Sequence, residues 1–235
     1  MLTVDKLNQF YGESHTLWDL DLDVPAGQCT CVMGRNGVGK TTLMKAIMGE
    51  VAVKSGQLRY QGDGSEVELT KKAVEARSRL GIGFVPQGRQ IFPLLTVEEN
   101  LRTGLAARGD GLKKIPERIY ELFPVLKEMK HRRGGDLSGG QQQQLAIGRA
   151  LVIEPKLLIL DEPGEGIQPN IVAQIGQVIR QLIKEDGLTV LLVEQKLPFA
   201  RKYADRFVIM DRGRPVAKGE ISELSNELIK QHLTV

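Results

Sequence analysis

The segment GRNGVGKT at residues 34–41 constrains the fold of this chain more than any other feature. It matches the pattern G-x-x-x-x-G-K-[ST], in which backbone N–H groups surround the phosphates of a nucleotide. In that pattern the lysine reaches the outer phosphates and the Ser/Thr hydroxyl binds Mg²⁺. Residues 28–33 are expected to form a buried strand before it, and residues 42–48 a helix that ends at Gly49. The phosphates would therefore lie at a helix N-terminus, which favours anions.

A second glycine motif, LSGGQ, occupies residues 137–141. Ser138 is expected to cap a helix that runs from Gln141 to about Ile153, and the two glycines let a ligand approach the backbone closely. Taken alone, Ser-Gly-Gly is more often an ordinary turn. Downstream of a phosphate loop, it predicts a second helix end that binds an anion. A chain with one nucleotide pocket needs only the first motif, so the second one requires an explanation.

The composition is that of an ordinary globular chain. Its 235 residues suffice for one substantial core with a small subdomain, and the net charge of +3 gives no reason to expect nucleic-acid binding. The N-terminus reads as a strand rather than as an export signal, and the apolar runs are too short to span a bilayer. Cys29 and Cys31 lie too close in sequence for an ordinary disulfide, which favours reduced core residues of a cytosolic protein.

The hydrophobic pattern predicts an α/β fold with a mostly parallel core sheet, an antiparallel β subdomain and a helical insertion. Residues 157–160 and 188–193 are continuous apolar runs, typical of parallel strands that are covered on both faces. Residues 88–136 lose the strand pattern and form the predicted insertion. The other expected elements are a half-exposed strand at 17–24, a hairpin of 58–60 with 67–69, a strand at 82–85, helical stretches at 97–107 and 116–130, a helix from 169 to Gly187, a hairpin of 207–210 with 215–217, and a C-terminal helix.

Two acids, Asp161 and Glu162, directly follow the apolar run at 157–160. Such an end could simply face solvent. Downstream of a phosphate loop the pattern favours a functional use, because nucleotide hydrolases with this loop hold Mg²⁺ through an Asp at the end of a neighbouring strand.

With the phosphate loop, LSGGQ and these acids in this order, the chain resembles the ATP-binding subunits of ABC transporters over essentially its whole length. The resemblance implies one ABC ATPase domain of the P-loop NTPase fold across residues 1–235, with residues 88–136 as its helical subdomain. In that family two subunits dimerise head to tail, and each ATP lies between one subunit's phosphate loop and the other's LSGGQ motif. The second glycine motif is therefore expected to serve the partner's nucleotide.

The resemblance also implies roles for individual residues, with ATP and Mg²⁺ as the cofactors. Glu162 is expected to polarise the attacking water, and Lys40 and Gln195 to complete the catalytic set. Gln87 matches a mobile loop that joins the γ-phosphate region to the insertion, and Tyr11 matches the aromatic that stacks on adenine, although both residues are unremarkable on their own. The expected ATP-binding residues are Tyr11, Gly34, Arg35, Asn36, Gly37, Val38, Gly39, Lys40, Thr41, Thr42, Gln87, Asp161, Ser138, Gly139, Gly140 and Gln141, and the expected magnesium-binding residues are Thr41, Gln87 and Asp161.

Three positions depart from the family pattern. Gln195 stands where a histidine usually contacts the γ-phosphate, Gln168 where an Asp is usual, and Gly164 where Thr or Ser is usual. A glutamine donates a hydrogen bond but carries no charge, so stabilisation of developing charge should be weaker. We hypothesise that the site on this chain's own phosphate loop hydrolyses ATP slowly or depends on a partner.

Four segments closely resemble the bacterial importers of hydrophobic or branched-chain amino acids and amides: LSGGQQQQLAIGRA at 137–150, ELFP at 121–124, TVEENL at 96–101 and VEQ at 193–195. Within that group, GRNGVGK at 34–40, the glutamine run and EGIQP at 165–169 look most like the urea and short-chain amide branch. The resemblance implies an ATP-hydrolysing importer subunit for urea or short-chain amides, with branched-chain amino acids as the alternative solute. The implied partners are a second, non-identical ATPase subunit (a homodimer is the alternative in isolation), two membrane permeases and an external solute-binding protein, but no nucleic acid. The implied location is the cytoplasmic face of the inner membrane.

Other functions remain as alternatives. An ABC ATPase that acts on DNA would need long coiled-coil insertions, and one that acts on the ribosome generally carries two cassettes; this chain has neither. In a P-loop kinase the LSGGQ helix would have no role. A subunit that binds nucleotide without hydrolysing it is a further alternative.

Overall fold

The structure, a computed structural model, describes residues 1–108 and 110–233 and contains two sheets. The larger sheet has the strand order β10-β9-β3-β8-β7-β6; it is parallel from β9 to β6, and β10 pairs antiparallel at its edge. The smaller sheet, β2-β1-β4-β5, is antiparallel. The strands are β1 (Leu2–Tyr11), β2 (Ser14–Val24), β3 (Cys29–Met33), β4 (Ser55–Tyr60), β5 (Val67–Glu68), β6 (Ile82–Val85), β7 (Leu157–Asp161), β8 (Thr189–Val193), β9 (Arg206–Asp211) and β10 (Arg214–Glu220).

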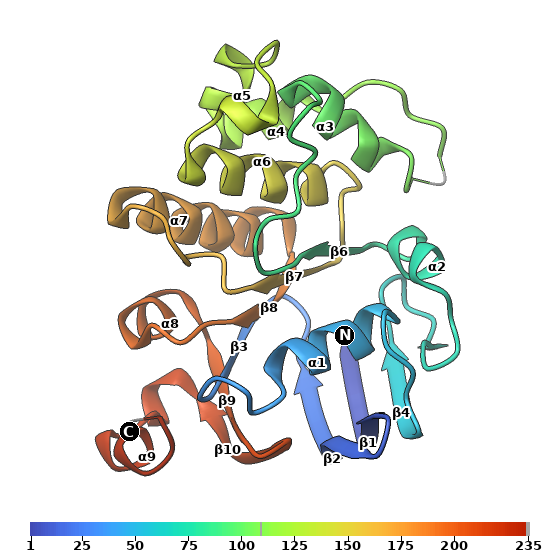
Figure 1. The fold of residues 1–235 in the computed structure, drawn as a ribbon, viewed down its shortest axis with the longest axis vertical. Helices are drawn as coiled ribbons and strands as arrows, with labels where there is room; N and C mark the ends of the chain where they lie inside the picture. The colour runs from blue at the N-terminus through green and yellow to red at the C-terminus, as the bar shows by residue number, and fades with distance from the viewer. Residues whose placement is uncertain (109, 234–235) are drawn as a thin grey trace.

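Helices cover the core sheet on one side, and α1 lies between the two sheets on the other (Figure 1). In the described part of the chain, no helix is both long and apolar enough to cross a bilayer. The helices are α1 (Lys40–Met48), α2 (Val74–Arg79), α3 (Val97–Leu105), α4 (Glu117–Leu122), α5 (Pro124–Glu128), α6 (Gly139–Leu151), α7 (Pro169–Asp186), α8 (Leu197–Tyr203) and α9 (Asn226–His232), with short 3₁₀ turns η1 (Gly134–Asp136) and η2 (Ile221–Glu223).

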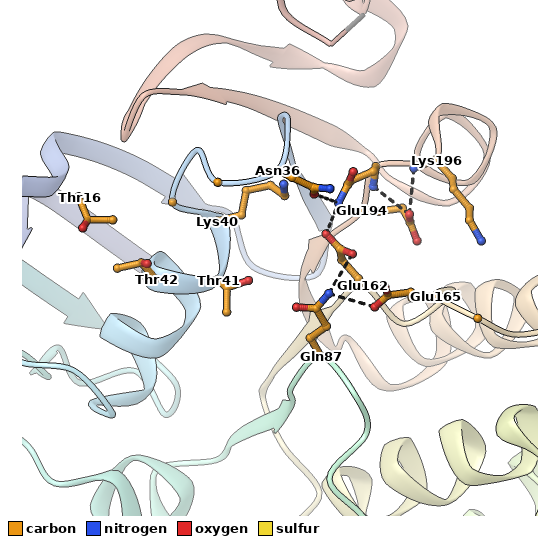
Figure 2. Close-up of a pocket in the computed structure, with 14 residues that line it drawn as sticks. Thr16, Asn36, Lys40, Thr41, Thr42, Gln87, Glu162, Glu165, Glu194 and Lys196 are labelled. Atoms are coloured by element: carbon orange, nitrogen blue, oxygen red, sulfur yellow. Dashed lines mark hydrogen bonds between the residues drawn. The ribbon is translucent and has the colours of Figure 1, made fainter. Parts of the chain in front are cut away.

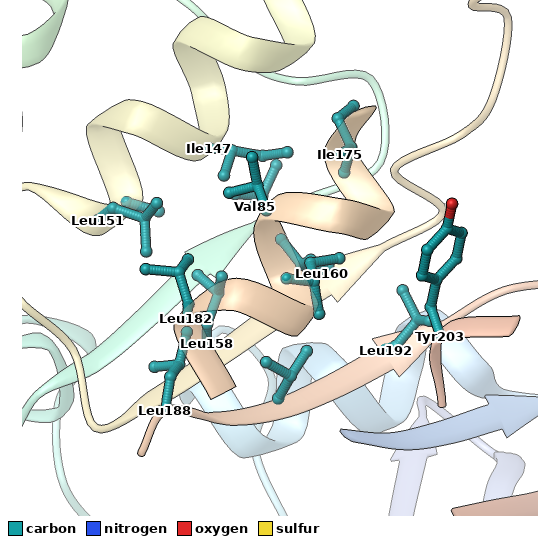
Figure 3. Close-up of a cluster of buried hydrophobic side chains, with 14 of the residues drawn as sticks. Val85, Ile147, Leu151, Leu158, Leu160, Ile175, Leu182, Leu188, Leu192 and Tyr203 are labelled. Carbon is teal, nitrogen blue, oxygen red and sulfur yellow. The ribbon is translucent and has the colours of Figure 1, made fainter. Parts of the chain in front are cut away.

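The core strands are buried on both faces, which explains their continuous apolar sequence. Side chains alternate between the faces because successive residues of a strand point in opposite directions. Ile159 and Leu191 pack with α1 and the small sheet, whereas Leu160 and Leu192 pack with α6 and α7. Figure 3 shows this second cluster, with Ile147 and Ile175 facing the sheet from the helices. The predicted α/β architecture is confirmed.

The segment between β6 and α6 is helical, as predicted, and its helices gather at one end of the molecule (Figure 1). The stretch expected to be helical at 116–130 contains two helices, α4 and α5. The break lies at Phe123, whose φ of −132° and ψ of 76° are not helical, and α5 starts at Pro124. Proline has no N–H and disfavours helical geometry in the residue before it, which explains the division.

The turn between β9 and β10 joins the phosphate loop to the antiparallel sheet. Gly213 donates its N–H to the Val38 carbonyl at 2.9 Å and accepts the Trp18 N–H at 3.0 Å. A Cβ at Gly213 would lie 2.1 Å from the Thr16 carbonyl oxygen, and the residue has a φ of +76°. Only glycine fits this position, so the turn fixes the phosphate loop against β2.

Both cysteines lie in β3 and are fully buried and free, in agreement with the predicted reduced core residues. Burial raises the pKa of the Cys29 thiol to about 12, with a further contribution from the Asp205 carboxylate. The pKa of Cys31 is also raised, mainly by burial.

Helix α2 was not predicted, and it carries a buried arginine that holds the end of α1. Arg77 is 1% exposed, and its Nη1 donates to the carbonyls of Ala46 at 2.8 Å and Ile47 at 2.5 Å. Its Nε donates to the Lys72 carbonyl at 2.9 Å. The last carbonyls of a helix lack partners within the helix and attract cations, so Arg77 satisfies the C-terminus of the helix that follows the phosphate loop.

We expect Arg77→Met to lower the free energy of unfolding by about 2–4 kcal/mol, because the Ala46 and Ile47 carbonyls lose the guanidinium donor and Ala46 keeps the Gly49 N–H. Arg79→Met, on the exposed side of the same helix, is the control and should change it by less than about 0.5 kcal/mol. Urea denaturation of both variants measures the difference. Equal midpoints would show that Arg77 does not stabilise α1.

Candidate functional site

The phosphate loop connects the end of β3 to the start of α1 and needs glycine at several positions. Gly37 and Gly39 have φ values of +80° and +105°, a region that favours glycine. A Cβ at Gly34 would lie 2.5 Å from the Met210 carbonyl oxygen. The loop can therefore keep its course, with N–H groups at the N-terminus of α1, only with these glycines in place.

Lys40, the first residue of α1, folds back over this loop. Its ammonium donates to the Gly34 carbonyl at 2.8 Å and to the Arg35 carbonyl at 2.9 Å. Burial lowers the pKa of Lys40, and the nearby Glu162 and Asp161 carboxylates act in the opposite direction. The side chain is thus held at the loop as a cation between backbone oxygens and two acids.

Asp161 ends β7 as a buried carboxylate, with 2% of its surface exposed. Neither of its oxygens has a hydrogen-bond partner of good geometry among the described residues. Burial raises the pKa of Asp161 to about 6, although the nearby Thr41 hydroxyl and Lys40 act to lower it. An unpartnered buried carboxylate is costly, and a bound cation would offset that cost.

The Glu162 carboxylate accepts hydrogen bonds from two side-chain amides (Figure 2). One carboxylate oxygen accepts from Gln195 Nε2, and the other lies 3.5 Å from Gln87 Nε2. Gln195 Nε2 also donates to the Asn36 side chain at 2.7 Å. The backbone of Glu162 has a φ of +50°, which is uncommon outside glycine. The structure therefore brings Glu162, Gln87 and Gln195 together, and their catalytic roles stay a prediction.

These residues surround a cavity of about 650 Å³ beside the phosphate loop (Figure 2). Among the described residues, no three His, Cys, Asp or Glu side chains are placed to hold a metal by themselves. Thr41, Asp161 and Gln87 lie at or beside the cavity as the candidates for a shared site with a ligand's own oxygens. The lining residues are Thr16, Asn36, Gly37, Gly39, Lys40, Thr41, Thr42, Gln87, Glu162, Glu165, Gly166, Glu194, Gln195 and Lys196.

The second glycine motif starts α6, as predicted, and Ser138 is its N-cap. The Ser138 side chain accepts from the Gln141 N–H at 3.4 Å, and the Gln141 side chain accepts from the Ser138 N–H at 2.9 Å. Ser138, Gly139, Gly140 and Gln141 line a different cavity, of about 480 Å³, together with Gln168 and part of α7. In the described part of the chain, the two glycine motifs thus line two separate cavities.

Three predicted ATP-binding residues lie in the phosphate loop without lining the cavity: Gly34, Arg35 and Val38. Tyr11 lies at the end of β1, where the chain turns into β2, and is 48% exposed. It does not line the cavity, whereas Thr16 on the neighbouring strand does. The structure therefore leaves the stacking role of Tyr11 a prediction.

Sequence reasoning missed Glu165, Glu194 and Lys196 in this cavity. Glu194 is buried, which raises its pKa, and one of its oxygens accepts the N–H groups of Gln195 and Lys196 at 2.8 and 2.9 Å. Glu194 thus fixes the loop that presents Gln195. Its sequence signal was the same as that of Asp161, an acid directly after a buried apolar strand.

Comparison with known proteins agrees with this geometry. The profile of the ABC transporter family matches residues 17–165. The chain is 43% identical to the high-affinity branched-chain amino acid transport ATP-binding protein BraG of Pseudomonas aeruginosa, over 92% of this chain and 91% of that protein. It is 38% identical to the probable branched-chain amino acid transport ATP-binding protein LivF of Archaeoglobus fulgidus, over 95% of this chain and 94% of that protein.

A solved structure with the same fold shows the cassette together with nucleotide products. It is a dimeric, post-hydrolysis state of an ATP-binding cassette bound to ADP and Pi, with a TM-score of 0.83 and 26% identity, and the match covers 94% of this chain and 99% of that chain. The phosphate loop, the acid pair after β7 and the LSGGQ helix occur here in one such fold. The chain therefore belongs to the ABC transporter family, as an ATP-binding subunit that couples ATP hydrolysis to transport.

Proposed function

We propose that the cavity beside the phosphate loop binds MgATP and that Lys40, Asp161 and Glu162 carry its hydrolysis. One observation supports these roles: the phosphate loop lies next to two consecutive acids, Asp161 and Glu162, whose surroundings differ. Asp161 is buried and has no hydrogen-bond partner of good geometry among the described residues, whereas Glu162 is held by amides at the cavity wall. Two carboxylates in contrasting environments suit two tasks, one towards a cation and one towards water.

In the proposed reaction a water attacks the γ-phosphorus, and the oxygen that bridges the β- and γ-phosphates leaves with the electron pair of the broken bond. Glu162 orients this water and accepts its proton, while Gln195 and Gln87 hold the carboxylate in place. Lys40 exchanges its two loop carbonyls for phosphate oxygens and, with the loop N–H groups, stabilises their charge.

Glu162→Gln should reduce ATP turnover by about 100-fold or more, because an amide cannot accept the proton of water. Its affinity for ATP should stay within about threefold of the parent, since the phosphate loop is untouched. Glu128→Gln, on the exposed side of α5, is the control and should retain parental turnover. Equal turnover of Glu162→Gln and the parent would show that Glu162 is not used and would favour a subunit that only binds nucleotide.

The residues around Asp161 fit Mg²⁺, which prefers oxygen ligands and shares its sites with substrate phosphates. The Thr41 hydroxyl, the Asp161 carboxylate and the Gln87 amide oxygen would hold it, since Gln87 Nε2 is already bonded to Glu165. When bound, the ion neutralises charge on the β- and γ-phosphate oxygens. The unpartnered oxygens of Asp161 support this assignment.

Asp161→Asn should stabilise the nucleotide-free chain at pH 8, because the pKa of Asp161 is raised to about 6 from an ordinary 3.8. A carboxyl group whose pKa is higher in the folded than in the unfolded chain lowers the free energy of unfolding when it is ionised. This destabilisation is complete above pH 6 and disappears as the pH falls towards 4. The expected gain is about 1–3 kcal/mol at pH 8, shrinking towards zero at pH 4. Urea denaturation across this range measures it, with the exposed Asp136→Asn as control. A gain independent of pH would contradict the burial of an unpaired charge.

We also propose that the LSGGQ end of α6 serves the nucleotide of a second ATPase subunit, with a non-identical subunit as the partner in the cell. The separation of the two glycine motifs into different cavities of one chain supports this arrangement. Two permeases and an external solute-binding protein would complete the importer, at the cytoplasmic face of a bacterial inner membrane. Gln195 bonds Glu162 through an uncharged amide, in keeping with the hypothesis of slow hydrolysis in this chain's own site.

The proposed solute is a branched-chain amino acid, because the relatives BraG and LivF carry that name. Urea or a short-chain amide is the second candidate. It rests on the GRNGVGK loop, the glutamine run after LSGG and the EGIQP segment at 165–169.

The transporter purified from membranes with its partners distinguishes these solutes. Leucine, isoleucine or valine, presented with the solute-binding protein, should raise ATP turnover several-fold, whereas urea and acetamide should not. Turnover that responds to urea or acetamide alone would overturn the amino-acid assignment and support the amide branch. A transporter carrying Lys40→Ala provides the background rate.

A further inference from the structure

The segment that follows Gln87 holds two consecutive residues in a strained backbone conformation. Arg89 and Gln90 have φ values of +68° and +48°. Non-glycine residues rarely adopt this region, and they do so where the surroundings hold them. Arg149 of α6 supplies the hold, since its Nη2 donates to the Gln90 carbonyl at 2.8 Å and its guanidinium lies 5.3 Å above the Phe92 ring. This backbone conformation directs the Arg89 side chain towards Glu165 and Gln142.

The Arg89 side chain connects two elements that belong to different functional sites. Its Nη2 donates to the carbonyl of Glu165, in the β7–α7 loop, at 3.3 Å. Its Nη1 donates to Oε1 of Gln142, in the first turn of α6, at 3.4 Å. The Gln142 amide is itself oriented, because its nitrogen donates to the Gly134 and Leu137 carbonyls at 3.2 Å each.

The guanidinium also lies close to the start of α6. A Cβ at Gly139 would be 3.3 Å from both terminal nitrogens of Arg89, so the absence of a side chain there permits the approach. The first turn of α6 contains no acidic residue. A cation beside the positive end of a helix is unfavourable by itself, and an anion that docks on the same end would remove the conflict.

The same segment also reaches this chain's own nucleotide cavity. Gln87 donates to the Glu165 carboxylate at 3.0 Å, two residues before Arg89 binds the Glu165 carbonyl. On the other side of that loop, Lys196 donates to the Gly164 carbonyl at 2.7 Å. Gln87, Arg89 and Lys196 therefore all bond the β7–α7 loop. Of these three residues, Arg89 also forms a hydrogen bond with α6.

We propose that Arg89 is a positioning residue that adds positive charge to the LSGGQ end of α6 for the triphosphate on the partner subunit. Because Arg89 and Gln87 hold the same Glu165, it also links that end to this chain's own cavity. This inference rests on the proposed function. If bound nucleotide moves Gln87, the hydrogen bonds of Glu165 and Arg89 would transmit that movement to the start of α6.

The test compares Arg89→Ala, Arg89→Lys and Arg89→Gln in the transporter purified with its partners. We expect Arg89→Ala and Arg89→Gln to lower kcat about tenfold and to bring the Hill coefficient for ATP towards 1, whereas Arg89→Lys restores most of the loss. Added salt should slow the parent and Arg89→Lys more than the neutral variants, because salt screens the charge. Arg102→Ala removes an exposed arginine of α3 that pairs with Glu98, and serves as control.

Titration of the isolated chain with a fluorescent ATP analogue separates this inference from the proposed function. Arg89→Ala should bind the analogue within about twofold of the parent, because Lys40's pocket is untouched. Parental kcat and Hill coefficient in Arg89→Ala would overturn the role of Arg89, as would a loss that Gln restores and Lys does not. If Lys40→Ala bound the analogue as well as the parent, the proposed nucleotide site itself would fail, whatever the result for Arg89.

Discussion

Parallel pairing of β3, β8 and β7 is the constraint on which the rest of the structure depends. The register sets Val32 beside Val193 and Val193 beside Asp161, so the three strands end at one edge of the sheet. The phosphate loop, the acid pair and the loop of Glu194 follow directly from those ends. Because both sheet faces are buried, the strands cannot slip without exposing an apolar core, and the polar residues are held at the edge.

Much of this arrangement could be predicted from sequence because the signals are local. The glycines of residues 34–39 indicate a loop, and the apolar run before Asp161 indicates a buried strand, from their own residues alone. Ser138 and Gln141 form the expected helix cap. The Phe123 break could have been read from Pro124 alone. The role of Arg77 could not be foreseen, because the carbonyls that it bonds lie about thirty residues away, in α1. The same applies to Glu165 and Lys196, whose partners come from other loops.

The residues that we propose for hydrolysis and for the link to α6 share one network of hydrogen bonds around the β7–α7 loop. Uncharged amides hold Glu162, while cations hold the loop carbonyls next to it. This division has a physical basis, since a cation bonded directly to Glu162 would make its carboxylate a weaker base. Arg89 and Lys196 act on backbone carbonyls instead, where they fix the position of the loop.

The burial of β3 has a practical consequence for spectroscopy. Cys29 and Cys31 are the two cysteines of the chain, both are inside the core, and burial keeps their thiols protonated at neutral pH. Thiol reagents attack the thiolate of accessible cysteines, so the folded native chain offers them almost nothing to modify. A single cysteine placed on the surface would then take a fluorophore or spin label selectively, without prior removal of the natural pair.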